Sequence, residues 1–199
     1  MPFQLTFSAA ALILANAVPI FGVLFLGWDA ASILVLYWLE SIVIGLLNIF
    51  KILTAGGLNK VGANLFLAAF FTVHYGLFSF GHGMFLAQTF GAQSIIEGLR
   101  GGGPLLWTAI SFVISHLISM LVNYYGKGEY LSAQAKDVMK LPYSRVLVMH
   151  ITIIIGGFLV QKMDEPLFAV IMLIVIKTAI DWKAHLKEHR AALKLSEAA

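Results

Sequence analysis

The sequence predicts an all-α membrane protein, a polytopic membrane helix bundle of six transmembrane helices with both termini in the cytoplasm. Three observations lead to this fold class: an apolar composition, six long apolar segments, and basic residues that collect on alternate connections. Of the 199 residues, 60% are hydrophobic and 12% charged, whereas soluble domains average about 45–50% apolar and about 25% charged residues. The chain has no cysteine, which excludes disulfides, thiolate nucleophiles and cysteine-ligated zinc.

The positions of the spans follow from length, since about 20 apolar residues are needed to cross roughly 30 Å of hydrocarbon. We expect six helices at Phe7–Leu26, Ala30–Leu53, Ala63–Gln88, Pro104–Tyr125, Tyr143–Val160 and Pro166–Lys183. No Lys or Arg precedes the first segment, so it is interpreted as a retained helix rather than a signal peptide. Residues 1–199 then form a single integral membrane domain, with residues 184–199 as a cytoplasmic helical extension.

Lysine and arginine set the orientation, because cytoplasmic loops of membrane proteins carry an excess of basic residues. With the N-terminus inside, the outer side receives only Arg100 and Lys162. The inner side receives Lys51, Lys60, Lys127, Lys136, Lys140, Arg145, Lys183, Lys187, Arg190 and Lys194. The net charge of +3 and the pI near 9.2 therefore reflect this bias rather than a nucleic-acid-binding face. We expect a multi-pass protein of the cell membrane, with the lipid bilayer as its partner.

Two connections are longer than a turn. The outer one, Thr89–Gly103, ends in three glycines followed by Pro104, a run that predicts a flexible loop and then a helix start. The inner one, Gly126–Pro142, is predicted to form a short amphipathic helix on the membrane surface. Its lysines would meet anionic lipid headgroups.

Each apolar segment carries a strongly polar group near its middle or inner end, a position that is costly in hydrocarbon and typical of a site. These groups are Asn16, Glu40, His74, His116, His150 and the Lys177/Asp181 pair. At a rise of 1.5 Å per residue, the groups of the first four spans share one depth, about 15 Å from the surface. A second histidine on the third span, His82, shares a face with His74 but lies about 12 Å away along the helix, too far to bind the same metal ion.

Glu40, His74 and His116 are the predicted metal ligands. Two imidazoles and one carboxylate suit a catalytic zinc or a non-haem iron ion with an open coordination position. The alternative is that these side chains only hydrogen-bond to each other and to Asn16, and so hold the helices together.

A second group lies nearer the cytoplasm and contains His150, Asp181 and His185. Asp181 and His185 are four residues apart and therefore share one helix face. The group is predicted to be a second metal site or a proton-handling site, with His150 and Asp181 as candidate catalytic residues. The alternative is an ordinary ion pair of Asp181 with Lys177 or Arg145.

Four short stretches carry a family resemblance: Tyr37-Trp38-Leu39-Glu40, His74-Tyr75-Gly76-Leu77-Phe78, Gly81-His82-Gly83 and Lys177-Thr178-x-x-Asp181. In these stretches the sequence resembles a family of uncharacterised bacterial multi-pass membrane proteins, known as a domain of unknown function. The resemblance covers nearly the whole chain. It implies six transmembrane helices and transfers no activity.

Four functions fit these features. The leading one is an intramembrane metal-dependent hydrolase or oxidoreductase that acts on a lipid-soluble small molecule, with zinc or iron activating a bound water. A b-type haem protein for electron transfer would use His74 with His116 or His150 as axial ligands. A proton or cation transporter would use the ionisable groups as a relay, and its small size would call for a homo-oligomer. Finally, a structural subunit would use them only to fix helix register.

Overall fold

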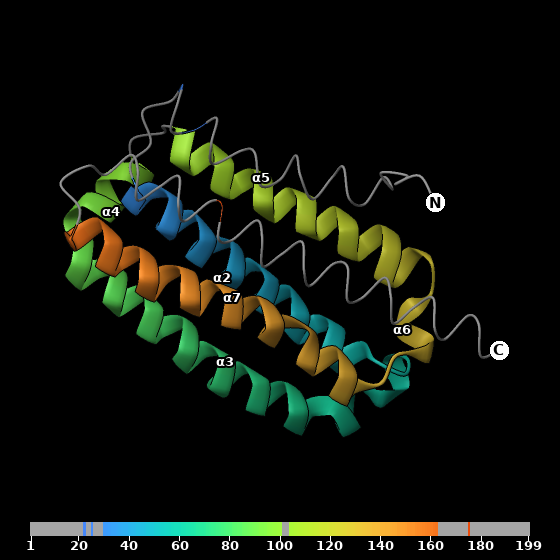
Figure 1. The fold of residues 1–199 in the computed structure, drawn as a ribbon. Coiled ribbons are helices and arrows are strands. Elements are labelled where there is room, and N and C mark those ends of the chain that lie inside the picture. Colours follow the sequence, from blue (N-terminus) through green and yellow to red (C-terminus); the bar gives the residue numbers. More distant parts are fainter. Residues whose placement is uncertain (1–21, 23–24, 26–29, 101–103, 163–174, 176–199) are drawn as a thin grey trace, which may run out of the picture. The chain divides into compact units, whose positions relative to one another are not determined.

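The computed structural model describes residues 22, 25, 30–100, 104–162 and 175 (Figure 1). Within these residues the regular elements are helices, and no strand occurs among them. The predicted spans Phe7–Leu26 and Pro166–Lys183 fall almost entirely outside the described residues, as does the extension 184–199. The chain divides into two compact units, one of Ala31–Ile153 and one that joins Met1–Ala30 to Ile154–Ala199. The contacts between helices described below all lie within Ala31–Ile153.

In the described part of the chain, four helical segments are long and apolar enough to cross a membrane: Ala31–Thr54, Leu58–Phe90, Leu105–Gly126 and Ala135–Ile155. They belong to α2 (Ala30–Thr54), to η1 (Leu58–Lys60) with α3 (Val61–Phe90), to α5 (Pro104–Ser119) with the π-helical η2 (Met120–Gly126), and to α7 (Ala135–Lys162). The second and fourth predicted spans agree with α2 and with α5–η2 to within one residue at each end, and the third agrees with α3 to within two. The all-helical fold class is confirmed for the described residues.

The two long connections contain helices. The outer connection contains the helix α4 (Ala92–Arg100). The three glycines that were predicted to form a flexible loop lie outside the described residues, and the helix start predicted at Pro104 is confirmed by α5. The inner connection contains only the single turn α6 (Glu129–Ser132) before α7 begins at Ala135. The amphipathic stretch that was predicted to be a separate surface helix is therefore mostly the first turns of α7, and the fifth span begins before Tyr143.

α7 passes through Pro142 because α2 supplies a replacement hydrogen-bond donor. A proline inside a helix has no N–H for the carbonyl four residues earlier, which here belongs to Val138. The amide of Asn48 on α2 donates to this carbonyl, with 3.2 Å between Asn48 Nδ2 and Val138 O, and Asn48 is 3% exposed. In a membrane such a freed carbonyl must be satisfied within the protein. Asn48 thus allows one continuous helix where the proline predicted a boundary.

Successive long helices run in alternate directions. Ser41 and Trp38 of α2 bond to Tyr75 and Ser79 of α3 in reverse order, which makes α2 and α3 antiparallel. The partners of α3 on α7 follow in the same order, since His74 meets Tyr143 and His82 meets His150. The partners of α2 on α5 and η2 also follow in the same order, as Glu40 meets His116 and Thr54 meets Tyr125. Such alternation in direction is the pattern expected of helices that cross one layer, such as a membrane, one after another.

The polarity of α3 is inverted relative to a soluble helix. Its buried positions form one stripe, and four of them are polar or polar-tipped: Asn64, Tyr75, Ser79 and His82. Its outward face instead carries Phe66, Val73, Leu77 and Phe80, which are between 63% and 78% exposed. Soluble proteins rarely leave so large an apolar surface open to water. The arrangement fits a helix whose outer face meets lipid and whose inner face meets other helices.

Glycine allows α2 and α3 to pack closely. A Cβ atom at Gly45 of α2 would overlap the ring of Tyr75, and one at Gly83 of α3 would overlap the indole of Trp38. The same indole donates to the Ser79 carbonyl across 2.7 Å. Small residues at such contacts are typical of membrane helix pairs, because they let large rings approach the opposite backbone.

Candidate functional site

Glu40 and His116 form a pair between α2 and α5. His116 Nε2 lies 3.3 Å from Glu40 Oε1, and the two side chains are 26% and 24% exposed. The imidazole N–H donates to the carboxylate in this arrangement. Counting residues from the span ends predicted that these two groups share one depth in the membrane, and their contact places them at the same level along α2 and α5. The pair joins two of the three predicted metal ligands.

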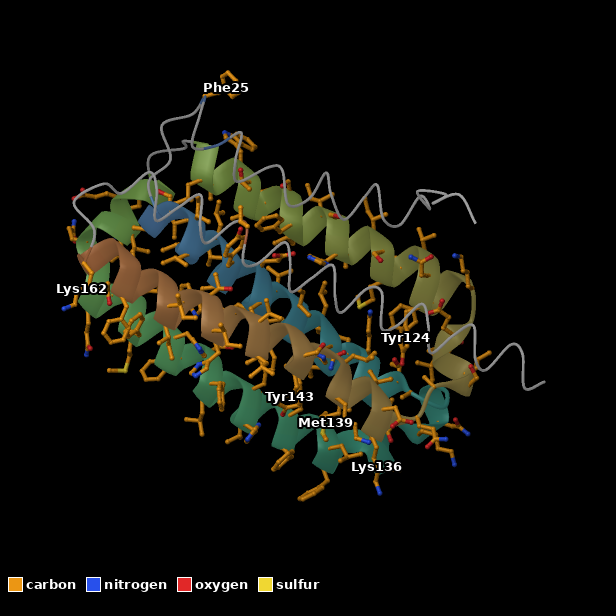
Figure 2. The ribbon with its side chains drawn as sticks, viewed as in Figure 1. Phe25, Tyr124, Lys136, Met139, Tyr143 and Lys162 are labelled. Atoms are coloured by element: carbon orange, nitrogen blue, oxygen red, sulfur yellow. The ribbon has the colours of Figure 1, made fainter. Side chains whose placement is uncertain are left out.

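His74 contacts a different helix. Its Nδ1 lies 2.9 Å from the hydroxyl of Tyr143 on α7, and its ring packs beside those of Tyr143 and Phe70. Figure 2 labels Tyr143 on α7, in the region where that helix lies next to α3. The structure therefore brings Glu40 and His116 together and places His74 beside Tyr143 instead.

A third pair, His82 with His150, lies between α3 and α7. His82 Nε2 is 2.8 Å from His150 Nδ1, and the other ring nitrogen of His82 is 2.7 Å from the Phe78 carbonyl on its own helix. His82 is 6% exposed, whereas His150 is partly exposed. The prediction that His74 and His82 share one face of their helix is confirmed, since both contact α7.

The predicted metal site is not complete among the described residues. Across residues 30–100 and 104–162, no group of three or more His, Cys, Asp or Glu side chains is placed to hold a metal ion. Glu40, His74 and His116 are all described, so the three do not converge on one ion as the shared depth had predicted. The physical reason is rotation about the helix axis: His74 is at a suitable height but points from α3 to α7.

The second predicted group is only partly described. Asp181 and His185 lie outside the described residues, as do Asn16 and Lys177, so a shared site of His150 with Asp181 and His185 stays a prediction. The structure pairs His150 with His82, for which the sequence predicted only that it lies too far from His74 to bind the same metal ion. One signal pointed toward it, namely that His82 lies on the same face of the third span as His74.

These features define a class: an all-helical protein with helices apolar enough to cross a membrane and with ionisable side chains paired between them. The chain belongs to a family of unknown function, DUF6498, whose model matches residues 2–198. The match confirms the resemblance to a domain of unknown function over nearly the whole chain. No curated protein and no solved structure matches the chain.

Proposed function

We propose that this chain is an integral membrane protein that binds and releases a proton, in the course of proton or cation transport, at the Glu40–His116 pair. The observation that carries the proposal is the 3.3 Å approach of a carboxylate to an imidazole between α2 and α5. Both helices are long and apolar enough to cross a membrane. Ionisable groups inside a bilayer are costly and mark ion pathways and proton relays.

The chemistry of the pair favours the exchange of one proton. With Glu40 ionised and His116 neutral the pair carries one negative charge, and the uptake of one proton makes it neutral overall. A neutral pair is favoured in a medium of low dielectric constant, because an isolated charge there loses its hydration. A second proton would leave a net positive charge, which the same medium opposes. Both side chains are partly exposed, so the described helices do not seal the pair off.

The orientation is also a proposal. In the described unit, the connection after α2 meets the connection before α7, because the Gly56 backbone N–H donates to the Tyr130 carbonyl across 2.7 Å. This end of the unit carries Lys51, Lys60 and Lys127, whereas Arg100 ends α4 near the opposite end of α3. The lysine-rich end would face the cytoplasm of the cell, as the excess of basic residues in cytoplasmic loops requires.

The test is proton flux in proteoliposomes that hold a pH gradient and an internal pH-sensitive dye. Wild-type protein should dissipate the gradient faster than protein-free liposomes, and Glu40→Gln and His116→Gln should each return the rate to the protein-free level. Glu97→Gln is the matched control, because Glu97 lies on α4, bonds to Gln93 and is outside the four apolar segments. Wild-type rates in Glu40→Gln would contradict the proposal.

A second candidate is that the pair holds zinc or iron for an intramembrane enzyme acting on a lipid-soluble substrate. What favours it is that a carboxylate and an imidazole, both ligands that zinc accepts, already face each other. Elemental analysis of detergent-purified protein should then find a stoichiometric metal that is lost in His116→Ala and retained in His74→Ala. Metal-free wild-type protein would reject this candidate, and an intense Soret band in the same sample would instead support haem.

A further inference from the structure

A backbone carbonyl fixes which histidine of the His82–His150 pair donates the hydrogen bond between them. His82 Nδ1 lies 2.7 Å from the Phe78 carbonyl oxygen. A carbonyl oxygen only accepts hydrogen bonds, so Nδ1 carries the proton in this contact. A neutral imidazole has one N–H, and the other ring nitrogen is an acceptor. His82 Nε2 is therefore an acceptor when the ring is neutral.

The tautomer of His82 in turn determines the tautomer of His150. Its Nδ1 lies 2.8 Å from His82 Nε2, and the two rings are almost perpendicular at 88°, so that ring nitrogens meet rather than ring faces. Because His82 Nε2 accepts, His150 Nδ1 must donate. The single N–H of neutral His150 is then used, and its Nε2 is left with a lone pair.

His150 lies in an apolar segment, beside an aromatic ring. His150 is partly exposed on a segment that is apolar enough to cross a membrane, and the Phe78 ring lies edge-on to it at 6.1 Å between centroids. Among the described residues, no hydrogen bond reaches His150 Nε2. His74 and Tyr143, two turns away on these two helices, are bonded to each other.

We propose that His150 Nε2 is the binding point for the hydroxyl group of a lipid-soluble alcohol, and that His82 is the positioning residue that keeps this nitrogen an acceptor. A ligand that reaches His150 from hydrocarbon must be mostly apolar, and a hydroxyl is a donor that enters hydrocarbon at far lower cost than a charged group. A metal ion would need further ligands, and the described residues offer no set of three. The site shares no residue or bond with Glu40–His116, so either proposal can fail alone.

The first test is the tautomer of His150, read from ¹⁵N NMR of histidine-labelled protein in lipid nanodiscs. The measurement is made at alkaline pH on the neutral form of the rings, which has one protonated and one bare ring nitrogen. Nitrogen atoms with and without a proton have well separated chemical shifts. We expect both His82 and His150 with protonated Nδ1 and bare Nε2. Protonated Nε2 on His150 in the wild-type protein would overturn the proposal.

Two variants separate positioning from folding. His82→Gln keeps a side-chain oxygen that can accept from His150 Nδ1, so His150 should keep its bare Nε2. His82→Leu removes the acceptor, and the His150 proton should move to Nε2. If the leucine variant fails to fold, the wild-type protein and the glutamine variant still decide the tautomer.

The second test adds 1-decanol as the hydroxyl probe. In the wild-type protein and in His82→Gln, the alcohol should shift the His150 Nε2 signal in a saturable manner and leave the ring nitrogens of His74 unchanged. The His74 signal is the internal control, since this ring is exposed and bonded to Tyr143. An unshifted His150 signal, or an equal shift at His74, would overturn the assignment of an alcohol site.

Discussion

Glu40 and Ser41 are neighbours in the sequence, yet they lie on two faces of α2 with different chemistry. Ser41 faces α3, where its hydroxyl lies 2.7 Å from the Tyr75 hydroxyl, and Tyr75 in turn donates to the Ser41 carbonyl. Glu40 faces α5 and meets His116. Ser41 and Tyr75 are about 5% exposed, whereas the ionisable pair is about one quarter exposed.

The face of α2 toward α3 holds the helices together, whereas the face toward α5 carries the candidate functional site. The Ser41–Tyr75 contact between α2 and α3 is buried and uncharged, and its two hydroxyl groups hydrogen-bond to each other, so it needs nothing from outside to be stable. The α2–α5 pair can change its charge and remains accessible. Substitutions facing α3 should therefore act on stability, and substitutions facing α5 should act on function.

The largest effect on the α3 side should come from Gly45→Leu. The new side chain would overlap the Tyr75 ring at a close helix contact, and overpacking of this kind typically costs about 1–3 kcal/mol, with more where backbone must move. We expect little folded protein after purification and a clear fall in thermal stability in detergent. Gly76→Leu is the matched control, because a Cβ there meets no atom within 4 Å. Equal stability of the two variants would show that the α2–α3 contact does not hold the bundle.

A smaller effect is expected on the side of α2 that faces α7. Asn48→Leu removes the donor to the Val138 carbonyl that Pro142 leaves free, and a buried unsatisfied carbonyl costs about 1–3 kcal/mol. Pro142→Ala restores a backbone N–H at that position. In this background Asn48→Leu should cost less, a coupling measurable by a double-mutant cycle of unfolding free energies. Additive costs would mean that Asn48 does not serve the proline.

Tyr75→Phe tests the hydrogen bonds of the α3 side without changing its packing. Two bonds to Ser41 are lost, and the expected loss of unfolding free energy is about 1 kcal/mol. Tyr143→Phe, which removes the more exposed bond to His74, should cost less. Unfolding curves of the two variants in the same detergent check the order, and a reversed order would contradict the assignment of a structural role to the α3 side.

The smallest effect on stability should come from Glu40→Gln. A partly exposed carboxylate–imidazole pair contributes about 0–1 kcal/mol, and glutamine keeps the shape and an acceptor oxygen. Thermal stability should stay close to that of the wild-type protein even where proton flux is lost. A stability loss as large as that of Asn48→Leu would place Glu40 among the structural residues instead.

Much of the candidate site could be named from the sequence, but its pairing could not. An ionisable residue in an apolar segment stands out in one dimension, so Glu40, His74, His116 and His150 were all identified. Residue counting also gave the common level of Glu40 and His116, because helix rise is constant. It could not give the partner of His74, since the direction in which a side chain points also depends on how each helix is rotated and crossed in the bundle.

The sequence by itself determined the helical class, the limits of α2, α3 and the α5–η2 segment, and the polar residues that these helices carry, because apolar length and periodicity are local properties. Only the tertiary structure decided that α7 continues through Pro142, that His74 meets Tyr143 and that His82 meets His150. Each of these depends on a group that another helix presents, such as Asn48, which lies 90 residues from the carbonyl it satisfies. Contacts between helices are set by packing geometry. That geometry depends on residues that are far apart in the chain, and no local sequence pattern reveals it.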